Sequence, residues 1–204
     1  MLLASFPDPA KATDGRGALG FHWSVISPDV ELEDIRAIAA SNIELAKQGS
    51  GGGWDVTPFH LIAMQRQPNL PLMRFLTRFA PHFAKTAASD GWLPIHYAAR
   101  YSDDEHMIEY LLQCDPSSTK KLTSRNNSPL HLACMNKSQG ANQVFDALLE
   151  VDSDPVRMIT SGGFTPLHIA CHGNLIEPGH VVATLLAKHK EAASVANTDG
   201  CLAV

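Results

Sequence analysis

The sequence predicts an all-α protein, a solenoid of stacked helix-turn-helix repeats joined by β-turn fingers. A short motif recurs along the chain, and its histidines lie at positions 22, 60, 96, 131 and 168. Successive histidines are 38, 36, 35 and 37 residues apart. A regular period of this length is typical of a repeat array, in which each unit is one supersecondary element.

The repeated motif carries the signals of a helix start. It reads Thr-Pro-Leu-His-Ile-Ala-Cys at 165–171, with related copies at 57–63, 93–99 and 128–134 and a fainter copy at 19–24. A threonine or serine before proline can act as the helix N-cap, and proline fits the first helical position. We therefore predict that a short helix begins in each copy. The copies at 93–99 and 19–24 lack the capping hydroxyl, so their helices should start less firmly.

The five histidines share one position in the motif, close to the helix cap. A neutral imidazole can donate one hydrogen bond and accept another. Each ring is therefore expected to bond to the capping hydroxyl and to the nearby backbone. This favours a structural role for the histidines over a metal-binding or catalytic one.

A second regularity predicts the other helix of each repeat. A leucine pair precedes the motif at 111–112 and 148–149, and Phe75-Leu76 stands in the same place. From the second residue of each pair to the next histidine the step is 19 or 20 residues. The pair at 2–3 obeys the same rule with respect to His22. This constant spacing indicates that each pair belongs to a repeated second helix.

Residues 165–170, Thr-Pro-Leu-His-Ile-Ala, resemble the signature of the ankyrin-repeat family, whose unit is a β-turn followed by two antiparallel helices. The period here is slightly longer than that of the family, so the extra residues should lengthen the connections between repeats. The resemblance implies one array over 1–204, with the end of a partial repeat at 1–13, a degenerate repeat at 14–53, further repeats at 54–88, 89–123, 124–160 and 161–197, and the start of a truncated repeat at 198–204.

Apolar stripes and caps predict the second helices in more detail. In the repeat at 54–88 the expected buried face consists of Leu72, Phe75, Leu76 and Phe79. In the next repeat Ser102 and Glu105 form a predicted capping box at the start of the helix. Prolines at 81, 116 and 155 follow the second helices, and we expect each proline to end the helix before it.

Composition and charge limit the classes of function. The chain has 204 residues, of which 45% are hydrophobic and 18% are charged, as in soluble globular proteins. A formal net charge of −5 argues against a nucleic-acid partner, which would require a basic face. No apolar run is long enough for a membrane span, and no signal peptide is indicated. We therefore expect neither nucleic acid nor membrane among the partners.

The four cysteines stand apart at 114, 134, 171 and 201. Cys134 and Cys171 share one position of the motif and are expected to be small buried residues. Because no disulfide framework is indicated, the cysteines favour a reducing, intracellular location, in the cytoplasm with the nucleus not excluded.

Sequence motifs of catalysis are missing from the array. The strongest candidate cluster for chemistry is Cys171, His172, His180 and His189. Zinc accepts these residue types, but the spacing crosses a helix turn and combines a core thiol with surface imidazoles. A cysteine–histidine catalytic pair would lack an orienting third group. We predict no catalytic residue, no cofactor, no metal site and no enzymatic activity.

The family resemblance implies that partners bind at the tips of the β-turns and on the exposed side of the first helices. The predicted tip residues are Trp54, Val56, Trp92, Asn127 and Phe164. The predicted first-helix residues are Met64, Arg100, Tyr101, Met135, Asn136 and His172. Their aromatic, methionine and arginine content matches that of protein-binding hot spots. In the alternative interpretation, Trp92 and Phe164 merely pack tip to tip between adjacent repeats.

Together these features predict a non-enzymatic scaffold for protein–protein interaction, which binds a partner protein on its concave surface. The alternative is a regulatory or substrate-recruiting arm of a larger enzyme or channel, with the catalytic part outside this chain. The scaffold is expected to be mainly monomeric, and end-to-end association through uncapped repeats remains open.

Overall fold

The computed structural model describes residues 55–203 except 174, 176 and 177, together with 22, 24–27, 31, 33, 34 and 37. The predicted segment 1–13 lies outside the described residues, as does most of the predicted repeat at 14–53.

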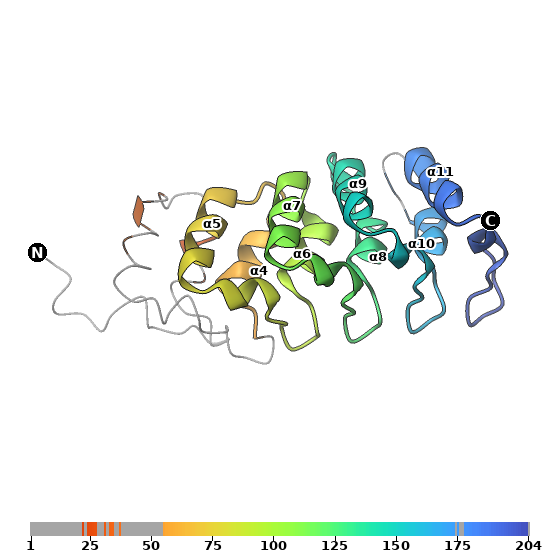
Figure 1. Ribbon diagram of the computed structural model, residues 1–204, viewed down its shortest axis with the longest axis horizontal. Helices are drawn as coiled ribbons and strands as arrows, with labels where there is room; N and C mark the ends of the chain where they lie inside the picture. Colours follow the sequence, from red (N-terminus) through yellow and green to blue (C-terminus); the bar gives the residue numbers. More distant parts are fainter. Residues whose placement is uncertain are drawn as a thin grey trace, which may run out of the picture.

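Helices alternate between two rows that run along the molecule (Figure 1). The first row contains α4 (Pro58–Ala63), α6 (Pro94–Tyr101), α8 (Pro129–Ala133) and α10 (Pro166–His172). The second row contains α5 (Leu70–Phe79), α7 (Glu105–Cys114), α9 (Ala141–Val151) and α11 (Pro178–Lys188). Over the described ranges no strand forms, and one isolated bridge joins Ala196 and Leu202. The predicted all-α solenoid of stacked helix pairs is confirmed.

Short 3-10 helices follow the second-row helices and lead into the next finger. They are η1 (Pro81–Lys85), η2 (Pro116–Lys120), η3 (Asp154–Arg157) and η4 (Lys190–Ser194). In the first two, the predicted helix-ending proline is itself the first residue of the 3-10 turn, where its missing donor and fixed φ are tolerated. These turns redirect the chain toward the next first-row helix.

Each first-row helix begins as predicted, immediately after its cap residue. Thr165 Oγ accepts the backbone N–H of His168 at 3.3 Å, and Ser128 Oγ does the same for His131 at 3.4 Å. Leu93 lacks this hydroxyl, yet α6 starts in the same register and contains 8 residues. Its cap backbone is still held, because the N–H of Leu93 donates to His96 Nδ1 at 2.9 Å. The missing hydroxyl therefore neither shifts nor shortens α6.

The fingers are β-turns that are joined to one another through the backbone. Within one finger the N–H of Thr123 donates to the carbonyl of Asn127 at 3.0 Å. Between fingers, the N–H of Ser161 donates to the carbonyl of Arg125 at 3.1 Å. One position in each turn has positive φ and is occupied by Asp55, Gly91, Asn126, Gly163 and Gly200. These are the residue types that tolerate the left-handed region.

The buried face of α5 differs from the predicted one. Leu72, Met73 and Leu76 are fully buried, whereas Phe79 is 49% exposed and Phe75 is half-buried. The core stripe is centred between Leu72 and Met73, so both phenylalanines lie at its edge. The prediction was wrong for Phe79, and it missed Met73.

The start of α7 also differs from the predicted capping box. Asp104 is the N-cap, and its carboxylate accepts the N–H of His106 at 3.0 Å. Ser102 lies two residues earlier, and its hydroxyl accepts the N–H of Asp104 at 3.0 Å. The serine therefore orders the approach to the helix, and the aspartate caps it.

Candidate functional site

The buried histidines fix the position of each finger relative to the helix behind it. Nδ1 of His131 accepts the N–H of Ser128 at 3.2 Å, so its proton lies on Nε2. Nε2 then donates to the carbonyl of Phe164 in the following finger, 3.1 Å away. Equivalent bonds run from His60 to Trp92 and from His168 to Cys201. His96 also donates forward, but to the carbonyl of Lys121, directly after η2. The predicted structural role of these histidines is confirmed.

A groove of about 510 Å³ lies between two fingers, the turn that follows α8, and α10. Its lining comprises Arg125, Asn127, Met135, Thr160, Ser161, Gly162, Phe164, His168, Ile169, His172 and Gly173. Four of these are predicted partner-binding residues, namely Asn127, Met135, Phe164 and His172. The fold therefore brings residues from two successive repeats to one surface.

The walls of this groove combine an apolar base with a polar rim. Met135 and Phe164 are half-buried against the core. The ring of Phe164 meets His168 edge to face, with centroids 5.9 Å apart. Arg125 and His172 are exposed. Such an arrangement can hold an apolar side chain at the base and polar or acidic groups at the rim.

Ile169 and Gly173 are among the groove residues that the predicted set omitted. Ile169 directly follows the motif histidine, and its side chain is 8% exposed at the base of the groove. Gly173 ends α10, and a Cβ there would lie 2.7 Å from the carbonyl oxygen of Ile169. The only sequence signal for either was its position relative to the histidine.

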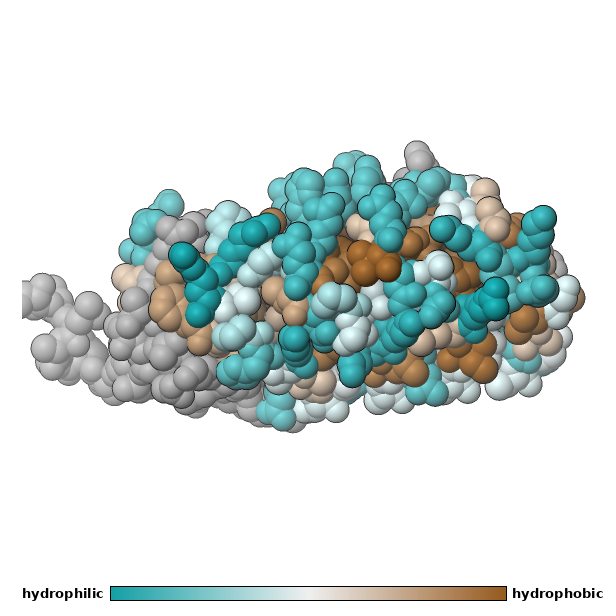
Figure 2. Space-filling view, in the orientation of Figure 1, coloured by the Kyte–Doolittle hydropathy of each residue, from teal (hydrophilic) through white to brown (hydrophobic). Residues whose placement is uncertain are grey.

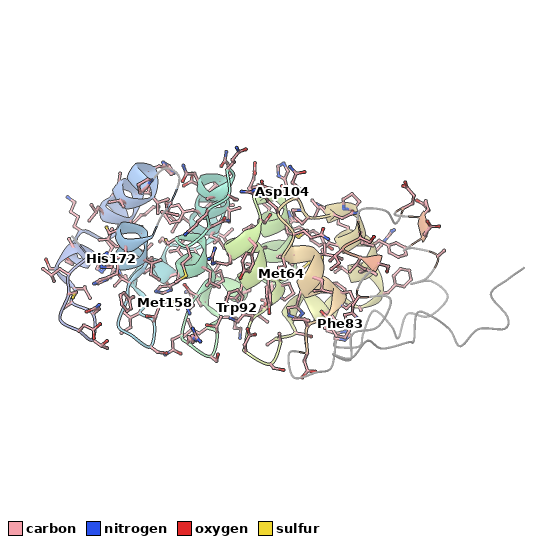
Figure 3. All side chains as sticks on the ribbon, turned by 180° about the vertical axis from the view of Figure 1, so that it is seen from behind. Met64, Phe83, Trp92, Asp104, Met158 and His172 are labelled. Atoms are coloured by element: carbon pink, nitrogen blue, oxygen red, sulfur yellow. The ribbon has the colours of Figure 1, made fainter. Side chains whose placement is uncertain are left out.

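Other predicted residues lie on the same side of the array but outside this groove. Figure 3 shows Met64 and His172 on the first-row helices, with Trp92 closer to the fingers. Met64 is 39% exposed and Tyr101 is 43% exposed. Val56 is half-buried. Trp54 lies outside the described residues.

Arg100 links α6 to the turn that follows α8. Its guanidinium donates to the carbonyl of Met135 at 2.8 Å and lies 5.1 Å from the ring centroid of Tyr101. The side chain is therefore held over the first-row surface rather than extended into solvent.

Asn136 conflicts with its predicted place on the partner surface, because the side chain is 1% exposed. Its amide donates to the carbonyls of Ala99 at 3.1 Å and Ser102 at 2.7 Å, and its oxygen accepts the N–H of Ser138 at 2.9 Å. These bonds join the end of α6 to the loop after α8. The residue has a structural role, which its polarity alone could not indicate.

The tip rings make their contacts within their own repeats. Trp92 lies 4.9 Å from the ring of Tyr97 and 6.3 Å from that of His96, centroid to centroid. Phe164 contacts His168 of its own helix. Among the described residues, adjacent fingers meet through backbone bonds and a few side-chain hydrogen bonds, and no ring contact joins them.

Burial determines the charge state of the motif histidines. It lowers the pKa of His60, His96 and His131 to about 4, and hydrogen bonds to backbone carbonyls only partly oppose this shift. These rings are therefore neutral at physiological pH. Within the described part of the chain, no three residues of the metal-binding types come together.

Stacked helix pairs, linked fingers and a groove on the first-row side define a helical repeat protein of the solenoid class. Residues 102–199 match the family model for ankyrin repeats in three copies. Residues 102–199 therefore carry ankyrin repeats, which confirms the resemblance found in the motif. Comparison with curated proteins gives no significant match. None of the described helices is long and apolar enough to span a bilayer.

Proposed function

We propose that this protein is a non-enzymatic scaffold that binds a segment of a partner protein in the groove between α8, α10 and their fingers. Ankyrin repeats generally mediate protein–protein interaction and are typically non-catalytic. The observation that carries the proposal is the groove itself, in which the apolar base of Met135 and Phe164 lies below exposed Arg125 and His172.

The chemistry of the groove indicates what a partner segment would present. One apolar side chain would fill the base beside Phe164, where burial is most favourable. Groups that accept hydrogen bonds or carry negative charge would face Arg125 at the rim. Because the fingers are tied together by backbone bonds, this surface is held in place before the partner arrives, which lowers the entropic cost of binding.

The experiment begins with affinity capture on the intact chain and mass spectrometry to identify a partner. Calorimetry then compares Phe164→Ala and Arg125→Ala with two control variants, Glu150→Ala on α9 and Arg157→Ala on η3. Loss of about tenfold or more in affinity for both groove variants is expected, with the controls unchanged. If the groove variants bind as tightly as the original protein, the partner uses another surface.

We further propose an intracellular location. Cys114, Cys134, Cys171 and Cys201 are all free thiols, and Cys134 is completely buried. Free cysteines persist in reducing compartments. Imaging of the tagged full chain in its own cells tests this proposal, and a signal confined to the medium or to secretory vesicles would contradict it.

A further inference from the structure

A second groove, of about 750 Å³, opens on the second-row helices. Pro71, Arg74, Phe75 and Arg78 of α5 and Tyr110 of α7 line it. The groove described above is instead formed by fingers and first-row helices. Figure 2 views the molecule from the second-row side, and strongly hydrophilic side chains lie over α5 next to less polar ones. The volume is in the range of protein sites that bind ligands or peptide side chains.

Aromatic rings give this second groove an apolar wall. Phe75 lines the groove, and it meets Phe79, which lies outside the lining, edge to face with ring centroids 5.0 Å apart. Tyr110 is half-buried on the facing helix. The guanidinium of Arg74 lies 4.5 Å from the centroid of the Tyr110 ring. This cation–π contact holds the guanidinium at the groove while leaving its edge free to donate hydrogen bonds.

The charge around this groove is positive, although the chain as a whole carries a formal charge of −5. Arg74 and Arg78 are exposed, and neither forms an ion pair within the described part of the chain. Lys85 adds to the positive charge near the end of α7. Its charge and that of Arg74 both act on the Cys114 thiol, where they oppose the rise in pKa that burial causes.

One acidic residue near this cluster, Asp115, is already occupied. Asp115 follows Cys114, and its carboxylate accepts from the N–H and the hydroxyl of Ser117 at 3.2 and 2.7 Å. It caps η2 and does not pair with either arginine. Two guanidinium groups beside an aromatic wall are thus left without a carboxylate from the described chain.

We propose that the groove between α5 and α7 is a second docking site, and that it binds an acidic peptide segment of a partner protein. Carboxylates of the segment pair with Arg74 and Arg78, and a neighbouring apolar side chain packs against Phe75 and Tyr110. The two arginines are one helical turn apart, with Cβ atoms about 5–6 Å from each other, so one short segment reaches both. Arginine forks match the geometry of carboxylates.

The aromatic wall favours a peptide over a small anion. A free inorganic anion would pair with the guanidinium groups but would bury none of the remaining exposed apolar surface of the groove. A peptide segment satisfies the charges and buries part of this apolar surface. The site shares no residue with the groove at α8 and α10. Each of the two binding proposals can therefore be tested, and refuted, without affecting the other.

The test uses fluorescence anisotropy with the full chain and a fluorescein-labelled peptide in which glutamates flank a central leucine. We expect saturable binding that weakens in about 0.5 M NaCl, because salt screens exposed charges. The double variant Arg74→Gln/Arg78→Gln should bind at least about tenfold more weakly. The matched double variant Arg157→Gln/Lys188→Gln, at two exposed cations outside both grooves, should bind as the original protein does. A peptide with glutamine in place of glutamate should not bind.

Charge reversal provides a second measurement. The variant Arg74→Glu/Arg78→Glu should lose the glutamate peptide and gain a peptide in which lysines flank the leucine. Because both arginines are exposed, these variants should keep the helical circular dichroism spectrum of the original protein. Equal binding of the glutamate peptide by the original protein and the double glutamine variant would overturn the proposal. So would equal binding of the glutamine peptide, or loss of binding in Phe164→Ala.

Discussion

Nε2 of His131 and the carbonyl oxygen of Phe164 are 3.1 Å apart and belong to different repeats. The same imidazole receives the backbone N–H of Ser128 through Nδ1. One neutral ring therefore holds both the start of its own helix and the finger that carries a wall of the groove. Stability of the array and geometry of the groove depend on the same buried side chain.

Replacing His131 with alanine should destabilise the array strongly. The variant leaves the N–H of Ser128 and the carbonyl of Phe164 without their partner in a buried setting, at a cost of about 2–4 kcal/mol. Urea unfolding followed by circular dichroism measures this loss. His106→Ala is the control, because that side chain is 65% exposed. A loss below about 1 kcal/mol for His131→Ala would show that the bond contributes little.

Acid should unfold the protein over a defined range. The pKa of His60, His96 and His131 is about 4 in the folded chain, below the ordinary value of 6.5. Between these values the unfolded chain takes up protons that the folded chain excludes. Stability should be complete above about pH 6.5 and should fall as the pH decreases toward 4, by roughly 3–4 kcal/mol per pH unit near pH 5 for the three rings together.

Urea unfolding at several pH values measures this slope. In His131→Gln the slope should decrease by about a third, because one of the three titrating rings is removed. Stability that stays constant between about pH 6.5 and 4.5 would contradict the burial of neutral imidazoles.

Two glycines should respond in opposite ways to alanine. A Cβ at Gly140 would lie 1.9 Å from the carbonyl oxygen of Asp103, so the loops after α6 and α8 would be forced apart. We expect Gly140→Ala to cost about 2 kcal/mol or more. Gly179 has nothing within 4 Å of its Cβ position and lies in α11, so Gly179→Ala should gain about 0.5–1 kcal/mol. Thermal unfolding distinguishes the two, and equal effects would contradict the close approach at Gly140.

Tyr101→Ala should weaken partner binding without unfolding the array. The side chain is 43% exposed at the end of α6, and Arg100 lies over its ring. We expect a loss of about tenfold in affinity for a partner that spans the first-row surface. Calorimetry on the folded variant measures this loss. Trp92→Ala tests the same surface closer to the fingers, and unchanged affinity in both variants would restrict binding to the groove at α8 and α10.

Local signals made most of the fold predictable from sequence. The cap, the proline and the histidine of each motif act within one helical turn, so their bonds could be inferred from spacing. The bond from His131 to Phe164 could not, because it joins residues 33 positions apart and exists only once the repeats stack. Burial of Asn136 has the same origin, since its partners at Ala99 and Ser102 belong to the preceding repeat.

The candidate site was predictable only in part for a related reason. Residues at finger tips and on first-row helices follow from their distance to each histidine, so Asn127, Met135, Phe164 and His172 could be named in advance. The second groove gave no periodic signal, because Arg74, Phe75 and Tyr110 occupy second-row positions that vary from repeat to repeat. It became visible only when α5 and α7 were placed side by side.

The imidazole bonds also give the array a direction. From His60 to Cys201, each ring donates forward to a carbonyl nearer the C-terminus, and none donates backward. Deleting a repeat from the C-terminal side removes the carbonyl that accepts the bond of the preceding histidine, and that imidazole is buried. Deleting a repeat from the N-terminal side instead exposes a carbonyl, which can accept a hydrogen bond from water. Removing a repeat from the C-terminal end should therefore destabilise the remaining array more than removing one from the N-terminal end. Fraying should be most severe in the repeat whose histidine has lost its acceptor.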